Sequence, residues 1–412
     1  MEWLRGGFVL AVLFTVVLPL NHMAGLRHTL LVIGFVLTFW QGVSFRAPAL
    51  PVKWPLLAWV VVAGLSASWS LDRIFTLREF KLEVLLGLMA FWLMYCSCQS
   101  LNKMWLLMRA ITLATVITVF VSIYQIWLLG GHDFHWNSNN NDPWEWVHGF
   151  VSYSTYLVLV FPVLFYMFLR GGWLGRWLGI VAMLLVFLAG WATQNRMFWV
   201  ALVLALSLGA GLWYAKYLPR LRSRWLPLIM MGVGLVVLII GFALVARDRP
   251  ANALAANTGG IFEILLHTFT QSERFLIWQY WLGAAQEHLW LGVGFGRDLP
   301  HMVFPKPADW PVLMFAHAHN VFIDVLLQLG VVGLSVFVIL LGSLMKRFWK
   351  YYRSNSEELV WLGMLGLTIL VAFASKNFTD DMFWRTDALV FWSLMGLILG
   401  AGERILKGPQ LQ

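Results

Sequence analysis

The chain has 412 residues, of which 60% are hydrophobic and only 12% are charged, and its formal net charge is +9. Charged residues make up about a quarter of a typical soluble protein, so this composition excludes a soluble globular fold. Apolar runs recur along the whole length, whereas a transmembrane barrel would show short alternating segments. The sequence therefore predicts an all-α polytopic membrane protein, in which the positive charge reports topology rather than nucleic-acid binding.

Twelve apolar runs are long enough to cross a hydrocarbon core of about 30 Å. They centre on residues 6–21, 29–43, 55–69, 83–98, 105–129, 150–169, 175–193, 197–215, 226–246, 319–343, 358–375 and 387–402. The first run lacks a small-residue cleavage site, so it is predicted to remain as a membrane span. We expect spans one to nine in residues 1–246, a helical loop subdomain in 247–318, and spans ten to twelve in 319–412.

Basic residues indicate which side of the membrane is cytoplasmic. They gather at the two termini and in the loops after even-numbered spans, where few acidic residues accompany them. The positive-inside rule makes this side cytoplasmic and places both termini there. The other side then holds all ten histidines, the polar loop from His132 to Gly149 and the large loop between spans nine and ten.

Four cations on this outer side are candidates for anion binding. Arg196 stands between two apolar spans, and its planar guanidinium suits phosphate oxygens, with snorkelling to lipid headgroups as the alternative. Arg274 opens a predicted amphipathic outer helix, where a salt bridge with Glu273 or another carboxylate is the alternative. Arg78 and Lys81 are three residues apart and share a helix face near the start of span four, with headgroup binding as the alternative.

The alternate glycines Gly292, Gly294 and Gly296 are a weak nucleotide-binding signal, because no strand precedes them and no βαβ unit surrounds them. A tight turn that returns the chain to the membrane is predicted instead. The sequence also has no P-loop, no Gly-x-Ser-x-Gly elbow and no Asp-x-Asp pair that would hold a metal on a nucleotide sugar.

His317 and His319 lie at the mouth of span ten, within residues 315–324. A histidine with an unperturbed pKa of about 6.5 takes a proton near neutral pH, which suits general-base chemistry. A helix-capping or otherwise structural histidine is one alternative. The other is a metal site completed by His132, His135, His148 or His301. Their spacing matches no standard zinc pattern.

The motif His319-Asn320, nine residues, Gly330, two residues, Gly333 resembles the signature of the O-antigen ligases and the related O-antigen polymerases. The resemblance extends to Arg196 after a mid-chain span, to Arg274 on an outer-loop helix and to the glycine turn at 292–296. It extends also to twelve spans with one large periplasmic loop between spans nine and ten. We further expect Gly330 and Gly333 to let span ten pack closely against a neighbour, which would hold His319 in position.

The resemblance implies a GT-C-like, inverting glycosyltransferase of the bacterial inner membrane that requires no metal or other cofactor. Ligases of this family move a polysaccharide from undecaprenyl diphosphate to a sugar hydroxyl of lipid A–core on the periplasmic face, in lipopolysaccharide biosynthesis. The implied partners are this donor, this acceptor and membrane lipids, without nucleic acid.

The chemistry of this reaction suggests roles for individual residues. His319 is the expected base, or hydrogen-bond acceptor, for the attacking hydroxyl. The side chains expected to bind the donor diphosphate are Arg196, Arg274, Arg78 and Lys81. His317 and Asn320 are expected on the acceptor side or directly behind His319.

Three other activities remain as alternatives. A polymerase would use the same donor with a second donor-linked chain as acceptor. A protein O-oligosaccharyltransferase usually has a large soluble C-terminal domain, whereas this chain ends soon after span twelve. A transporter for an anionic solute or lipid would place ionisable residues deep within the spans, where the sequence has few. The close fit of the His-Asn motif favours the ligase.

Overall fold

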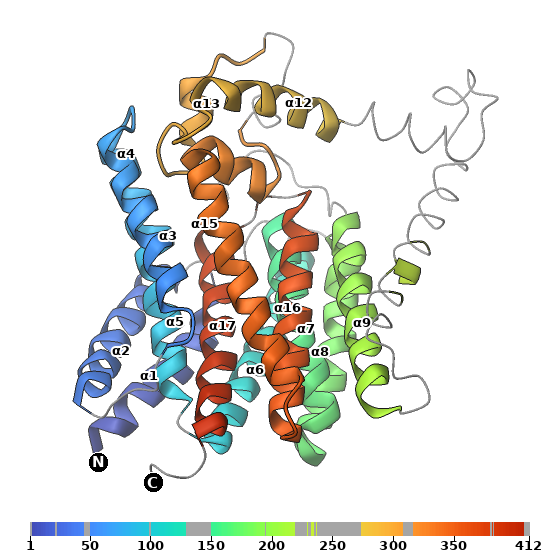
Figure 1. Cartoon of the computed structure of the whole chain (residues 1–412). Coiled ribbons are helices and arrows are strands. Elements are labelled where there is room, and N and C mark those ends of the chain that lie inside the picture. The colour runs from blue at the N-terminus through green and yellow to red at the C-terminus, as the bar shows by residue number, and fades with distance from the viewer. Residues whose placement is uncertain are drawn as a thin grey trace, which may run out of the picture.

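The structure is a computed structural model that shows a bundle of upright helices with shorter helices across one end (Figure 1). It describes residues 2–20, 23–44, 50–98, 100–128, 150–193, 195–218, 229, 232–234, 236, 273–307, 316–379, 381 and 383–407. Over these ranges the chain contains helices and no β-strand. The protein is an all-α polytopic membrane protein, as the sequence predicts.

The upright bundle is formed by helices from both ends of the chain. They are α1 (Glu2–Val17), α2 (Ala24–Ser44), α3 (Lys53–Leu65), α4 (Arg73–Glu79), a π-helical turn η3 (Phe80–Leu85), α5 (Leu86–Ser97), α6 (Leu101–Leu128), α7 (Phe150–Arg170), α8 (Gly172–Ala192), α9 (Arg196–Tyr217), α15 (Val321–Tyr352), α16 (Glu357–Asn377) and α17 (Arg385–Lys407).

Eight helical segments in the described ranges are long and apolar enough to cross a membrane, and three shorter apolar helices accompany them. Together these eight plus three segments correspond to eleven of the predicted spans. The predicted ninth span at 226–246 falls almost entirely outside the described residues, so the total of twelve stays a prediction.

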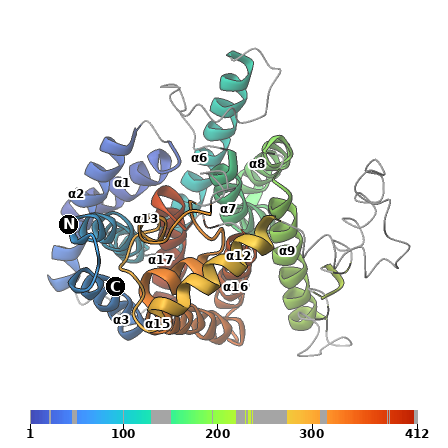
Figure 2. The ribbon, with the colours of Figure 1, turned by 90° about the horizontal axis from the view of Figure 1, so that it is seen from above.

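Two short helices, α12 (Glu273–Ala285) and α13 (Leu299–Val303), lie across one end of the bundle, which we call the loop side (Figure 1). Seen from above, α12 crosses α15 and α16, and its first turn points toward α9 (Figure 2). The helix α9 ends on the opposite side, where Lys216 donates to the Ser354 carbonyl at 2.9 Å. The chain therefore changes sides between α9 and α12, as the predicted ninth span requires.

Small residues bring α17 close to α5. An added Cβ at Gly396 would collide with the Phe91 carbonyl, and one at Gly400 would collide with the Tyr95 carbonyl. Two glycines four residues apart on one helix face allow the backbones of membrane helices to approach closely. The two glycines thereby hold the middle of α17 against α5.

The helix α15 is broken at Gly330, where φ is 64° and ψ is −167°. This conformation is open essentially to glycine alone. The glycine also makes room, because a Cβ there would collide with the backbone of Trp290 and Leu291. The close neighbour predicted at Gly330 is thus the returning outer loop. At Gly333, a Cβ would meet Leu329 of the same helix.

The outer loop satisfies the backbone groups that the break releases from the helix. Before the break, the loop donates to the helix: Val293 N–H to the Leu327 carbonyl at 3.0 Å and Gly294 N–H to the Gln328 carbonyl at 2.9 Å. After the break, the helix donates to the loop: Val331 N–H to the Leu289 carbonyl at 2.8 Å and Val332 N–H to the Trp290 carbonyl at 3.3 Å. Unpaired backbone groups inside a membrane protein are costly, so these four bonds lock the loop to α15.

Substituting alanine for Gly330 is expected to lower the free energy of unfolding by about 3 kcal/mol or more. The positive φ and the collision with Trp290 each contribute on the order of 1–3 kcal/mol. Gly342→Ala, on the same helix with open space around its Cα, is the matched control and should change stability little. Unfolding in detergent solution measures both, and equal behaviour of the two variants would contradict this account of the break.

The first turns of α15 pack against both the outer helices and the bundle. A separate hydrophobic cluster on the loop side contains Ile277, Trp281, Ala284, Ala285, Val293, Leu299, Phe304, Ala318, Ile323 and Leu327. Its members come from α12, the returning loop, α13 and the start of α15. Val321, Val325 and Leu329, on the same stretch of α15, belong instead to the bundle core. Residues 321–329 therefore join the outer helices to the bundle.

Candidate functional site

Asn320 begins α15 as its N-cap. Its Oδ1 accepts hydrogen bonds from the backbone N–H of Phe322 at 2.9 Å and of Ile323 at 3.3 Å. Asparagine is among the preferred residues at this position because it satisfies N–H groups that have no partner within the helix. This cap fixes the orientation of the preceding residues; the predicted acceptor-side role of Asn320 stays a prediction.

His319 has a left-handed backbone, with φ of 52°. Few residues other than glycine adopt this conformation, and such strained positions cluster at functional sites. The turn presses its imidazole against that of His317, with ring centroids 3.8 Å apart. The His319 ring is partly exposed on the loop side, while His317 is buried behind it.

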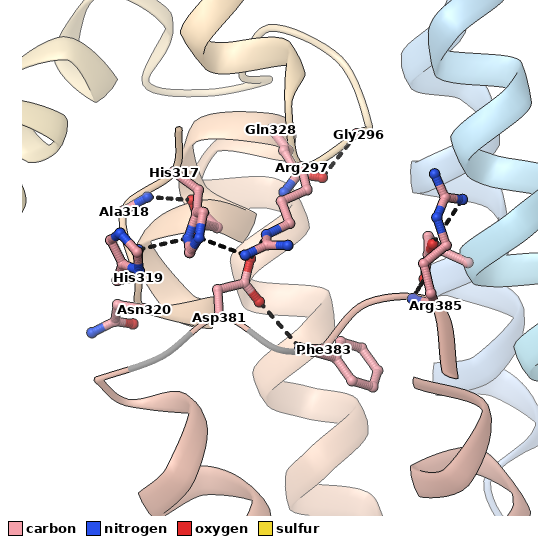
Figure 3. Close-up of polar contacts among 12 residues, drawn as sticks. Gly296, Arg297, His317, Ala318, His319, Asn320, Gln328, Asp381, Phe383 and Arg385 are labelled. Atoms are coloured by element: carbon pink, nitrogen blue, oxygen red, sulfur yellow. Dashed lines mark hydrogen bonds and ion pairs between the residues drawn. The ribbon is translucent and has the colours of Figure 1, made fainter. Parts of the chain in front are cut away.

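His317 connects His319 with a buried arginine (Figure 3). The Nδ1 atom of His317 accepts from the backbone N–H of His319 at 3.0 Å, and its Nε2 atom lies 2.5 Å from Nη2 of Arg297. A guanidinium only donates, and a neutral imidazole has a single acceptor nitrogen. Only one of the two contacts can use the lone pair of the imidazole. The tautomer of His317 therefore decides whether its acceptor nitrogen faces Arg297 or the backbone N–H of His319.

The glycine turn predicted at 292–296 delivers Arg297 to this position. Gly292, Gly294 and Gly296 all have positive φ, between 65° and 142°. The Gly296 N–H donates to Oε1 of Gln328 at 2.8 Å, which ties the turn to α15. Arg297 then places its Nε atom 3.5 Å from an oxygen of Asp381.

Two buried carboxyl groups complete the cluster. Asp324 accepts from the Ala318 N–H at 2.9 Å, and Asp381 accepts from the Phe383 N–H at 3.3 Å. Burial, followed by the nearby Asp324 carboxyl, raises the pKa of Asp381 well above its usual range, although Arg297 opposes the shift. Arg297, whose Nε atom lies 3.5 Å from an oxygen of Asp381, is the cation that opposes this shift.

The raised pKa of Asp381 predicts how stability depends on pH. Because the folded state holds the proton more tightly, wild-type protein should lose stability as the pH rises from about 4 toward the raised pKa. Asp381→Asn removes this titration. As the pH rises over the same interval, the melting temperature of the variant should therefore increase relative to that of the wild type. Melting curves of both proteins at several pH values measure the difference, and parallel profiles would contradict the shift.

His317, Asp324 and Asp381 each offer one atom within 4.8 Å of the others, a spacing that could suit a metal ion. The guanidinium of Arg297 contacts His317 and Asp381, however, and so occupies the place of a cation. These residues therefore fit a metal poorly. Of the histidines considered for a metal site in the sequence, His132, His135 and His148 lie outside the described residues, as does the loop that carries them.

A second charged cluster lies beside the first, across a cavity of about 40 Å³ lined by Glu83, Arg297 and Trp384 among others. Arg385 donates to Glu79 at 2.9 Å and, through its backbone N–H, to Glu83 at 2.7 Å. The indole ring of Trp384 contacts both guanidinium groups, with Arg297 at 5.1 Å and Arg385 at 4.7 Å from its centroid. Trp384 thus holds the two arginines apart in fixed positions.

The structure separates the four predicted donor-binding cations. Arg78 and Lys81 are on the exposed side of α4 and η3, and they do not join the His319 cluster. Arg274 is half-buried in the first turn of α12. Arg196 begins α9, where the Asn195 side chain caps the helix, but the Arg196 side chain lies outside the described residues.

Sequence reasoning missed the role of Arg297, Asp324 and Asp381. Arg297 directly follows the glycine turn, and its position after three alternate glycines was the available signal. Asp324 lies one turn after Asn320, on the helix that follows the histidines. Asp381 is distant in sequence, and only the fold brings it to the cluster.

The family model described as O-antigen ligase matches residues 181–338 of the chain. The matched segment contains His317, His319, Arg297 and the break at Gly330, and it ends before Asp381. No curated protein matches the chain. Residues 181–338 of this chain therefore carry a domain similar to the O-antigen ligase family.

Proposed function

We propose that the protein is an O-antigen ligase, which transfers a polysaccharide from undecaprenyl diphosphate to a sugar hydroxyl of lipid A–core. The match of residues 181–338 to this family supports a membrane glycosyltransferase of the ligase or polymerase type. The observation that carries the proposal is His319, which the strained turn holds against His317 at the loop-side mouth of α15.

In this reaction His319 accepts the proton of the acceptor hydroxyl as the oxygen attacks the anomeric carbon of the donor sugar. A new glycosidic C–O bond forms, and the C–O bond to the diphosphate breaks with its electron pair leaving on the diphosphate. Attack from the face opposite the leaving group inverts the anomeric configuration. Undecaprenyl diphosphate is a stable anion, so its departure needs positive charge near it and no added proton.

Arg196 and Arg274 are the proposed ligands of the donor diphosphate. Arg274 lies in the first turn of α12, which points toward the end of α9 that begins at Arg196 (Figure 2). Two guanidinium groups at a membrane surface match two linked phosphates in charge and geometry. The sequence also suggested Arg78 and Lys81 for this role; their exposed position, away from the His319 cluster, favours a different ligand.

We further propose that the loop side faces the periplasm of a bacterial inner membrane and that both termini are cytoplasmic. The helix α1 begins and α17 ends on the side opposite α12 and α13 (Figure 1). The basic residues of the sequence gather on that same side.

Transfer by purified protein tests the proposal. Reconstituted with polysaccharide-linked undecaprenyl diphosphate and lipid A–core, the protein should produce lipopolysaccharide of increased mass on a gel. A chelator should leave the rate unchanged, since arginines supply the positive charge. Chain lengthening with donor alone would indicate a polymerase, and no transfer with any acceptor would reject the enzyme.

A further inference from the structure

The helix formed by α4 and η3 separates its charges by sign. Glu79 and Glu83 turn inward, where Arg385 neutralises both. Arg78 and Lys81 turn outward and are exposed. The acidic residues of this helix are thus already paired, and its outward cations remain available for a ligand.

The outward face is also apolar. Ile74 is 83% exposed and Leu77 is 53% exposed, and both lie within one helical turn of Arg78. Arg73, one turn before Leu77, is exposed as well and donates to the Ser68 carbonyl at 3.3 Å. We call Arg73, Ile74, Leu77, Arg78 and Lys81 the α4 stripe.

The surroundings of the α4 stripe extend this amphiphilic surface. Leu71 is 72% exposed and Trp290 is 69% exposed. The two chain segments meet, because Nε1 of Trp69 donates to the Leu291 carbonyl at 3.0 Å. The acidic neighbour Asp72 is engaged as the N-cap of α4, where it accepts from the Phe75 N–H at 2.9 Å.

The α4 stripe carries three cations on the side of the protein where basic residues are otherwise scarce. The helix α4 reaches the level of α13, above the loop-side ends of α7 and α9 (Figure 1). Cations with apolar neighbours at a membrane surface match anionic amphiphiles, whose phosphates meet the charges while their chains cover the apolar residues.

We propose that the α4 stripe binds the phosphate groups and adjoining acyl chains of the acceptor lipid. This inference rests on the proposed function, which supplies an acceptor built from a phosphorylated lipid and a sugar core. It assigns to Arg73, Arg78 and Lys81 an acceptor subsite that is separate from the reaction centre.

The chemistry of the two lipid substrates selects the acceptor. The donor diphosphate is attached directly to the carbon that reacts, so it must lie beside His319. The acceptor presents its hydroxyl on a sugar core, so its lipid phosphates lie several sugars away. Figure 3 shows Arg385, the inward partner of α4 and η3, on the far side of Arg297 from His319. The outward face of α4 is therefore remote from the reacting bond, as the acceptor phosphates must be.

Replacing the three cations with glutamine, as Arg73→Gln, Arg78→Gln and Lys81→Gln together, tests the proposal in nanodiscs of neutral lipid. Each charge near an anionic lipid contributes about fivefold to binding, so the loss of three charges should raise the Kd for phosphorylated lipid A–core and the acceptor KM each by about a hundredfold. Binding of dephosphorylated lipid A–core, the donor KM and kcat should stay unchanged. The matched control is Lys346→Gln with Lys350→Gln, which removes exposed cations from the opposite end of α15.

Three results would overturn the assignment. A rise in the donor KM would show that Arg78 and Lys81 bind the donor diphosphate. An unchanged Kd for phosphorylated lipid A–core would show that the α4 stripe does not bind the acceptor. Equal competition by phosphatidylglycerol would show that the stripe binds anionic lipid without preference for the acceptor. Because binding is measured without turnover, a wild-type protein that lacks transfer activity would reject the proposed function separately from this subsite.

Discussion

His319→Asn is expected to lower the rate of transfer by about 10²–10⁴-fold, the usual contribution of a general base. Asparagine is the appropriate substitution because it tolerates the left-handed backbone at this position better than alanine does. The substitution therefore removes the imidazole while it preserves the turn. The loss should appear in kcat, measured with purified protein at saturating donor and acceptor.

His288→Asn is the matched control, because His288 is an exposed histidine on the loop side that ends a short 3₁₀ turn. It should retain wild-type activity. Melting curves for both variants distinguish loss of chemistry from loss of fold. If His319→Asn is folded and transfers at the wild-type rate, the base is another group and the proposed mechanism fails.

Arg297→Gln is expected to destabilise the protein by about 3–5 kcal/mol and to abolish most transfer. Arg297 is 12% exposed, and its removal leaves the buried Asp381 without the guanidinium that lies beside it. His317 would also lose the contact at Nε2 that sets its tautomer. The ring of His317 would then no longer be held in place against the His319 ring. Unfolding in detergent and the transfer rate measure the two effects separately.

A second substitution tests whether charge is the cause. Adding Asp381→Asn to Arg297→Gln removes the uncompensated carboxylate and should recover part of the lost stability, without recovering activity. Arg353→Gln, at the exposed C-cap of α15, should change stability by less than about 0.5 kcal/mol. Strict additivity of the two substitutions would show that Arg297 and Asp381 are energetically independent.

The sequence was sufficient for the membrane-spanning architecture because hydrophobic length is a local property. Each predicted span that falls in the described residues corresponds to a helix, and the glycine turn at 292–296 is present. The break in α15 was beyond local reasoning. Residues 319–343 read as one continuous apolar run, and Gly330 becomes a break only because the returning loop supplies partners for the released backbone groups.

The candidate site was predictable only in part, for the same reason. His319 and His317 adjoin a recognisable motif, so the sequence singled them out. Arg297 and Asp381 are 84 residues apart (381 − 297) and meet through packing of the outer loop against the start of α17. Arg78 and Lys81 share a helix face, as predicted from their spacing, but the sequence did not reveal that this face is the outward one.

The break at Gly330 divides α15 into two pieces that the returning outer loop holds together, because the loop bonds to the backbone on both sides of the glycine. The upper piece, next to His319, packs against the outer cluster and also against the bundle core through Val321, Val325 and Leu329. A tilt of the bundle, such as a thinner bilayer would impose, is therefore transmitted to the start of α15. We expect turnover to change across nanodiscs of different acyl-chain length.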